Sequence, residues 1–250
     1  MTDLALPVSR VLLWRHGQTE WNSAGRFQGQ QDPPLDEEGR NQAARAAPHL
    51  LAAGLSPENT LVVSSDLTRA AETAATLTAL LGVPLRLDER LREHGMGCWE
   101  GLTRSEVADR FPEQYADWIA GRPVRDRGAE DPAEVGVRAL AALADLPEVG
   151  TAVVVTHGGT AGRLLEGLLG LGPDQRRAFG PLANCAWSEL VLQGSRWRLL
   201  RHNMSVLQLP EGRSDGVREA VPTLRSVPPL ADATAPDGAS APAGDADAVL

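Results

Sequence analysis

The sequence of 250 residues contains no lysine, and all 24 of its permanently cationic side chains are arginines. This absence excludes a Walker-A phosphate loop, which needs a lysine, and any enzyme that forms a Schiff base through lysine. Arginine remains for anion recognition, because its planar guanidinium group binds phosphate through paired hydrogen bonds. Genomic base composition is a sufficient cause of the arginine excess, but the chemical exclusion holds either way.

Cysteine and long apolar segments are scarce as well. Cys98 and Cys185 are far apart and fit no CxxC or Cys/His spacing, so the sequence predicts neither a disulfide framework nor a zinc site. No apolar run approaches the roughly 20 residues of a membrane span. The segment MTDLALPVSR at the start lacks the basic and apolar regions of a secretory signal. We therefore expect a cytoplasmic protein that uses no metal or other cofactor and does not bind membranes.

The chain also lacks an excess of positive charge. Its formal net charge is -9, whereas a general nucleic-acid binder needs a basic face. Beyond about Pro210 the sequence is rich in Ala, Pro, Asp and Gly and nearly lacks aromatic residues. Such a segment cannot bury enough apolar surface to offset the entropy of ordering. We predict one domain over residues 1–208, a disordered tail over residues 209–250, and no nucleic-acid partner.

Apolar runs typical of buried strands alternate with helical patterns in the predicted domain. The strand runs are residues 11–14, 60–65, 83–87 and 151–156, and the helical patterns cover residues 39–54, 67–82, 104–110, 113–120, 132–146 and 160–171. Two more strand patterns flank a tight turn at Gly194–Ser195. Continuous apolar strands joined by helices predict a mainly parallel sheet covered on both faces. The predicted fold class is α/β, a three-layer α/β/α arrangement with an antiparallel edge strand from the final hairpin.

Unusual polar residues stand where these strands end. Arg15-His16-Gly17 follows the first strand, and His157-Gly158-Gly159 follows the run at 151–156. Arg69 lies at the start of the helix after the second strand, and Glu93 lies in the polar loop after the run at 83–87. Glycine after each histidine permits a sharp turn and the close approach of a ligand.

The convergence of these side chains is more informative than any one of them. A lone histidine after a strand is usually a hydrogen-bonded loop residue, and Arg69 or Glu93 alone reads as a solvated charge. In open α/β sheets, however, functional groups collect at the carboxyl ends of the strands. Two histidines, two arginines and a glutamate at one sheet edge are too many buried polar groups for packing alone. The pattern predicts a phosphate site that contains a nucleophile.

Four sequence motifs resemble the signatures of the histidine phosphatase superfamily, which includes the phosphoglycerate mutases, and they occur in the same order as in that family. RHGQTEWN is similar to the RHGxTxxN signature, and SSDLTRAAETA to the second arginine motif. LREHGMGCWEG is similar to the acid-loop motif, and VVVTHGG to the second histidine motif. The motifs span residues 15–159, which is most of the predicted domain.

The resemblance implies a phosphatase that works through a phosphohistidine. It makes His16 the nucleophile and Glu93 the general acid for the leaving oxygen and then the general base for water. It assigns the phosphate oxygens to Arg15, Arg69 and His157, which clamp the transferred group. The remaining substrate contacts implied in these motifs are Asn22, Thr19 and Gly158.

Two alternative functions stay open beside the phosphatase. A cofactor-dependent phosphoglycerate mutase would need a cover over the site, and the mutases resemble one another in a long insert for this purpose. The segment between Glu93 and His157 reads instead as ordinary short helices, which favours hydrolysis. A phosphate-binding regulatory module without catalysis would be expected to lose His16 or Glu93, and both are present.

A finer resemblance concerns one group within the family, the actinobacterial glucosyl-3-phosphoglycerate phosphatases. It rests on GRFQGQQDPPLDEEGRNQA, on GLTRSEV and on the segment from NCAWSEL to WRLLRHN. The resemblance implies a small phosphorylated substrate of this kind and places Gln28 near its phosphate or glycerate portion. A homodimer is implied by the family resemblance alone.

Overall fold

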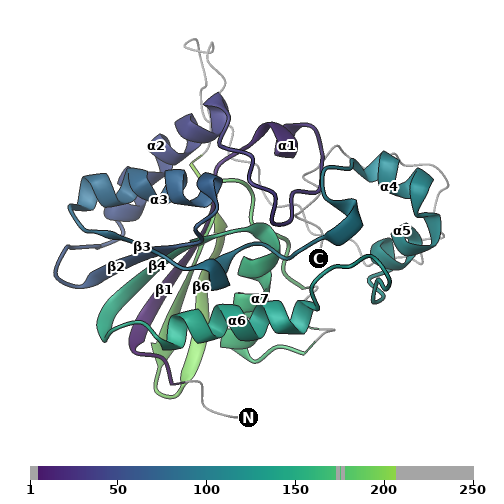
Figure 1. The fold of residues 1–250 in the computed structure, drawn as a ribbon. Coiled ribbons are helices and arrows are strands. Elements are labelled where there is room, and N and C mark those ends of the chain that lie inside the picture. Colours follow the sequence, from purple (N-terminus) through teal and green to yellow (C-terminus); the bar gives the residue numbers. More distant parts are fainter. Residues whose placement is uncertain (1–4, 173–174, 176–177, 207–250) are drawn as a thin grey trace, which may run out of the picture. The chain divides into compact units, whose positions relative to one another are not determined.

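The computed structural model describes residues 5–172, 175 and 178–206. The predicted domain boundary at residue 208 and the predicted disordered tail over residues 209–250 lie outside this part of the chain. Six strands of the described part form one sheet in the order β3-β2-β4-β1-β5-β6 (Figure 1).

Four of these strands run parallel. They are β1 (Val8–Arg15), β2 (Thr60–Ser64), β3 (Leu85–Leu87) and β4 (Val149–Thr156). β1 and β2 both pair with β4, and β3 pairs with β2. The last two strands are β5 (Trp187–Gln193) and β6 (Arg196–Met204), which flank the predicted turn at Gly194–Ser195. Because β5 pairs antiparallel with β1 and β6 pairs antiparallel with β5, the expected antiparallel edge is confirmed.

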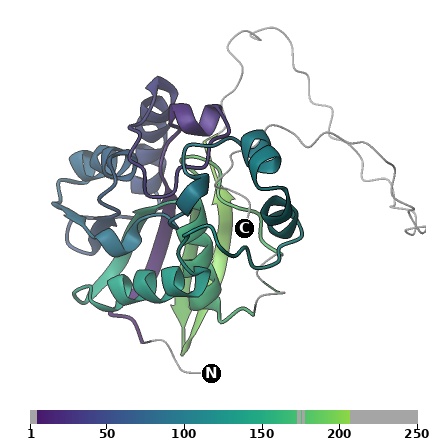
Figure 2. The ribbon, with the colours of Figure 1, turned by 45° about the vertical axis from the view of Figure 1, so that its right-hand side comes forward.

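Helices cover both faces of the sheet, as Figures 1 and 2 show. One layer contains α2 (Glu37–Leu51) and α3 (Thr68–Leu81), and the other contains α6 (Pro132–Ala144) and α7 (Gly158–Leu169). Because successive strand side chains point to opposite faces, the apolar run of β1 serves both cores. Leu12 and Trp14 pack with α2 and α3, whereas Val11 and Leu13 pack with α6 and α7. The predicted three-layer α/β/α fold is confirmed.

The remaining elements gather beyond the carboxyl ends of the strands. They are α1 (Glu20–Ser23), α4 (Arg104–Arg110), α5 (Pro112–Ile119) and two single 3-10 turns at Glu89–Leu91 and Gly97–Trp99. α4 begins with a capping box at Thr103, and α5 has a proline in its first turn. Both helices pack on a small apolar cluster that includes the rings of Phe27, Trp99 and Trp118.

Two observations bear on the sequence expectations for membranes and metals. Every helix in the described residues falls short of the length and apolarity that crossing a bilayer requires. The same residues contain no group of three or more His, Cys, Asp or Glu side chains arranged to hold a metal ion.

Candidate active site

The register of the parallel strands brings the two predicted histidines together. Arg15 and Thr156 are paired at the ends of β1 and β4, so His16 and His157 are the next residues of neighbouring strands. The amide of His16 donates a hydrogen bond of 3.0 Å to Thr156 O, which extends the pairing by one residue. The centroids of the two imidazole rings lie 5.1 Å apart. The expected convergence at one sheet edge therefore follows from strand pairing.

A backbone hydrogen bond fixes the tautomer of His16. Its Nδ1 lies 2.7 Å from Gly17 O, and a carbonyl oxygen can only accept a hydrogen bond. The proton of the neutral ring is therefore on Nδ1, and the lone pair is on Nε2. The side chain is buried, with 1% of its surface exposed. His16 thus has one nucleophilic nitrogen whose direction is set by the hydrogen bond to Gly17 O.

Burial and positive charge keep this imidazole neutral. Desolvation holds the pKa of His16 well below its ordinary value, and the guanidinium groups of Arg69 and Arg15 lower the pKa further. Burial likewise holds the pKa of His157 well below its ordinary value, with Arg69 and His16 as the next causes. These effects also show that both arginines lie near the histidine pair. The predicted group of two arginines and two histidines is present.

The protonation of the pair leads to a first prediction. In an NMR pH titration, we expect the His16 and His157 ring signals to titrate well below the ordinary histidine value of about 6.5. Replacing Arg69 with methionine removes a cation, so both midpoints should move to higher pH. Arg10→Met, about 20 Å from His16 near the other end of β1, should leave both midpoints unchanged. Equal midpoints in the Arg69→Met and unmodified proteins would contradict this electrostatic account.

His157 is held by a serine at the end of the neighbouring strand. Ser65 follows β2, and its Oγ lies 2.9 Å from His157 Nε2. The other ring nitrogen, Nδ1, is buried and has no hydrogen-bond partner among the described residues. A buried polar atom of this kind is costly unless a ligand satisfies it. His157 Nδ1 is therefore suited to contact an oxygen of a bound phosphate.

Both arginines are fully buried and are oriented by backbone carbonyls. Arg15 donates to Leu182 O at 2.7 Å. Arg69, in the first turn of α3, donates to Gln31 O at 2.7 Å and to Gly29 O at 2.9 Å. The same loop caps α3, because the Asp32 carboxylate accepts hydrogen bonds of 2.7 Å from the amide and the hydroxyl of Thr68. The segment FQGQQD, which contains the predicted contact Gln28, thus helps to position Arg69.

The Glu93 side chain contacts the N-terminus of α7, the helix that begins directly after His157. Its Oε2 accepts a hydrogen bond of 2.9 Å from Gly159 N, and its Oε1 accepts one of 3.0 Å from Thr160 N. The Thr160 hydroxyl and the amide of His94 also donate to Oε1, at 3.2 Å and 2.8 Å. An added Cβ at position 159 would lie 2.7 Å from Glu93 Oε1, so any larger residue would displace this carboxyl group. The predicted acid is therefore fixed beside the histidine pair.

Gly17 has a different role from the one expected. The sequence suggests a sharp turn or close contact with a ligand, yet an added Cβ would meet Gly39 O at 2.5 Å. Gly39 in turn has no room for a Cβ, because Gln18 O would lie 2.0 Å away. The two glycines let the start of α2 pack directly on the segment after His16. At Gly17 this helix contact, rather than a ligand, explains the residue.

The predicted substrate contacts in the first motif form a hydrogen-bond network. Thr19 caps α1, and its backbone amide and hydroxyl donate to Asn22 Oδ1 at 3.0 Å and 3.1 Å. The Thr19 hydroxyl also lies 3.1 Å from Gln28 Oε1. Asn184 connects this network to the nucleophile, because its Nδ2 donates to Asn22 Oδ1 at 3.3 Å and to His16 O at 3.2 Å. These residues are placed around the backbone of the first motif.

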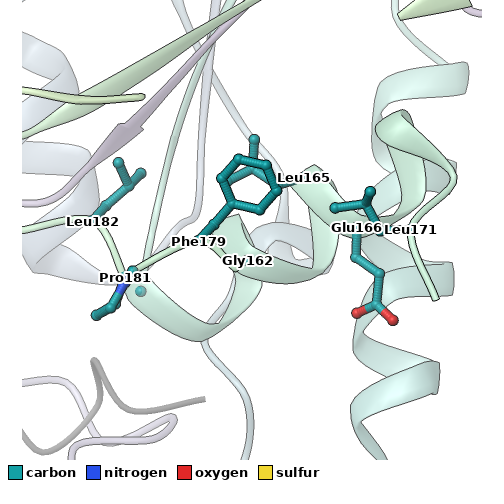
Figure 3. A pocket seen from close by; sticks show the side chains of 9 residues that line it. Gly162, Leu165, Glu166, Leu171, Phe179, Pro181 and Leu182 are labelled. Atoms are coloured by element: carbon teal, nitrogen blue, oxygen red, sulfur yellow. The ribbon is translucent and has the colours of Figure 1, made fainter. Parts of the chain in front are cut away.

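Gly158, the other predicted contact, begins α7 and lines a pocket beside it. Figure 3 shows this pocket between α7 and the segment 179–182. Its lining is largely apolar, with Leu165, Phe179 and Leu182 among the contributing side chains. Leu182 also provides the carbonyl that orients Arg15, so the pocket adjoins the group of buried arginines.

Sequence reasoning missed three residues of this site. Ser65 directly follows β2 within the quoted motif SSDLTRAAETA, and Thr160 comes directly after the quoted motif VVVTHGG, so position relative to the motifs is a usable signal for both. Asp32 gives no such signal, because its partner Thr68 is 36 positions away.

Comparison with known proteins identifies the family. The sequence profile described as "Histidine phosphatase superfamily (branch 1)" matches residues 11–205. A glucosyl-3-phosphoglycerate phosphatase of Mycolicibacterium vanbaalenii is 36% identical over 194 residues, which cover 74% of this chain and 84% of that protein. A protein of Enterobacter sp. (strain 638) named "Probable phosphoglycerate mutase GpmB" is 35% identical over 192 residues, which cover 75% of this chain and 87% of that protein.

Solved structures give the same result. A mycobacterial glucosyl-3-phosphoglycerate phosphatase described as a complex with VO3 has a TM-score of 0.71 and 37% identity. The match covers 79% of this chain and 100% of that one. These comparisons confirm the predicted fold class and the predicted class of enzyme, a phosphoric monoester hydrolase. The chain belongs to the histidine phosphatase superfamily.

Proposed function

We propose that this chain hydrolyses a small phosphate monoester through a phosphohistidine on His16, and that its substrate is glucosyl-3-phosphoglycerate. One observation carries the mechanism. The hydrogen bond of 2.7 Å between His16 Nδ1 and Gly17 O leaves the lone pair on Nε2, beside two buried guanidinium groups. A neutral imidazole nitrogen in a cationic site is a suitable nucleophile for a phosphate ester.

The first step transfers the phosphoryl group to the enzyme. His16 Nε2 attacks the phosphorus, the bond to the ester oxygen breaks, and Glu93 gives its proton to that oxygen so that the product leaves as an alcohol. Arg15, Arg69 and His157 Nδ1 bind the phosphate oxygens and balance their charge. Protein groups positioned before the reaction are the main source of catalysis in such transfers.

The second step releases phosphate. Glu93, now ionised, takes a proton from a water molecule, whose oxygen attacks the phosphorus while the bond to His16 Nε2 breaks. Inorganic phosphate leaves, and a proton remains on Glu93 for the next cycle. The proposal uses no metal ion or organic cofactor, because guanidinium groups supply the positive charge. A cytoplasmic location and a homodimer belong to the same proposal and rest on the sequence pattern and the family resemblance.

The choice of substrate is supported by the relatives that carry the name glucosyl-3-phosphoglycerate phosphatase, at 35% to 36% identity. A phosphoglycerate mutase is the second candidate, since relatives at 35% identity carry that name. The two reactions differ in what attacks the phosphohistidine, a water molecule in the phosphatase and a second phosphoglycerate oxygen in the mutase.

The test of the proposal measures the product of the phosphatase, inorganic phosphate, and the product of the mutase, 2-phosphoglycerate, in parallel. The purified protein is incubated with glucosyl-3-phosphoglycerate, 3-phosphoglycerate and other sugar phosphates, and inorganic phosphate release is measured. We expect the highest kcat/KM with glucosyl-3-phosphoglycerate. A second reaction contains 3-phosphoglycerate with 2,3-bisphosphoglycerate, and robust formation of 2-phosphoglycerate would favour the mutase. Binding of these compounds with no turnover would instead indicate a regulatory module.

A further inference from the structure

Arg138 lies on α6, outside the residues assigned to phosphate and proton chemistry, yet it contacts the loop that carries Glu93. Its Nη1 donates to Arg90 O at 2.6 Å and to Arg92 O at 2.8 Å, and its Nη2 donates to Glu93 O at 3.0 Å. The side chain is 19% exposed. One guanidinium group therefore binds three backbone carbonyls within residues 90–93 of the loop that carries Glu93, called the acid loop below.

Glu130 occupies the other donors of the same guanidinium group. Arg138 Nε donates to Glu130 Oε1 at 2.8 Å, and Nη2 donates to Oε2 at 2.9 Å. Guanidinium has five N–H donors in a rigid plane, and here each of the five has an acceptor. The orientation of Arg138 is thus determined completely by its partners.

Glu130 extends the contact to the far side of Glu93. Its Oε2 accepts a hydrogen bond of 3.0 Å from Gly95 N, and its backbone amide donates to Gly95 O at 3.0 Å. The Glu130 carbonyl oxygen lies 2.8 Å from His94 Nε2. Arg138 and Glu130 together hold the backbone immediately before, at and after Glu93.

We infer that Arg138 is a positioning residue that fixes the backbone of Glu93, so that its carboxyl group is aimed at the leaving oxygen. The carboxyl end is already held by Gly159 and Thr160 on α7. Arg138 holds the opposite end of the same residue from α6. A displacement of about 1 Å in a reacting group costs about 100-fold in rate, so both ends must be fixed. The inference rests on the proposed role of Glu93 as general acid.

The test compares two leaving groups in one variant. An alkyl phosphate needs a proton on its leaving oxygen, whereas 2,4-dinitrophenyl phosphate releases a stable anion and needs none. The measured quantity is the ratio of kcat/KM for glycerol 3-phosphate to kcat/KM for 2,4-dinitrophenyl phosphate. Because kcat/KM covers only the steps up to enzyme phosphorylation, and the ratio cancels the fraction of active enzyme, partial unfolding does not alter it.

Arg138→Met keeps the stem of the side chain and removes all five donors. We expect this ratio to fall about 10- to 100-fold. The charge of Arg138 also lowers the pKa of His157, so Arg138→Lys separates charge from geometry. The lysine ammonium group cannot donate to three carbonyls and a carboxylate at once. The ratio of the two kcat/KM values in Arg138→Lys should therefore stay close to the ratio in Arg138→Met. Recovery of the full ratio in Arg138→Lys would overturn the positioning role.

Arg10→Met is the matched control. Arg10 is 20% exposed, pairs with Glu189 and donates to the carbonyl of Ala53, but it lies at the amino-terminal end of the sheet. The ratio of the two kcat/KM values in Arg10→Met should equal the ratio in the unmodified protein. A uniform loss on both substrates in Arg138→Met, or no loss, would overturn the inference. Glu93→Gln serves as the reference, because an unchanged ratio there would refute the proposed acid itself.

Discussion

Replacing His16 with asparagine is expected to reduce phosphatase turnover by at least about 10⁴-fold, the scale on which loss of a covalent nucleophile acts. Asparagine Nδ2 can still donate to the Gly17 carbonyl that now accepts from His16 Nδ1. The amide carries no nucleophilic nitrogen in place of Nε2, so the enzyme cannot be phosphorylated. Phosphate binding by Arg15, Arg69 and His157 should persist. The measurement is steady-state phosphate release with p-nitrophenyl phosphate and with glucosyl-3-phosphoglycerate.

The covalent intermediate gives an independent check of the same variant. After rapid mixing with substrate and quenching, the unmodified protein should carry a phosphate group that is labile in acid and stable in base. His16→Asn should carry none, although phosphate should still protect it in thermal unfolding. His49→Asn, an exposed change in the last turn of α2, is the control. Equal turnover in His16→Asn and the unmodified protein would rule out His16 as nucleophile.

Local patterns were sufficient to locate the residues at the strand ends. The apolar run before Arg15 and the run before His157 are buried strands, because each is covered by helices on both faces. The predicted helix at Arg104–Arg110 agrees with α4. α7 begins two residues earlier than predicted, at Gly158. Glycine is a poor helix former, but the first amides of α7 are stabilised by the Glu93 carboxylate, a contact that helix propensity does not describe.

Contacts between distant segments could not be predicted in this way. The strand order β3-β2-β4-β1-β5-β6 depends on pairing between segments far apart in the sequence. The hydrogen bonds from Thr68 to Asp32 and from Arg138 to the acid loop also join segments that are far apart in the sequence. Asp32 and Arg138 look like ordinary surface charges in the sequence. α1 was also missed, because four residues are too few for a helical period, and only the capping box at Thr19 marks its start.

Glu93→Gln is expected to lower kcat/KM for an alkyl phosphate by about 10²- to 10⁴-fold, the usual contribution of a general acid. Glutamine is close to glutamate in shape, and its amide oxygen can still accept the hydrogen bonds from Thr160 N and His94 N, so that only the contact with Gly159 N is lost. The amide cannot donate a proton to the leaving oxygen or take one from water. For 2,4-dinitrophenyl phosphate, kcat/KM should change little, because its leaving group needs no proton.

The second role of Glu93 separates it from a residue that only assists the leaving group. In Glu93→Gln the water that attacks phosphohistidine has no base, so dephosphorylation becomes the slow step. With 2,4-dinitrophenyl phosphate we therefore expect a burst of dinitrophenolate, equal to the enzyme concentration, followed by slow turnover while phosphohistidine accumulates. Glu89→Gln, an exposed change in the same loop, is the control and should keep the fast steady turnover of the unmodified protein. A Glu93→Gln enzyme with steady turnover and no burst would mean that Glu93 is not the base, and the acid–base assignment would have to move to another residue of the site.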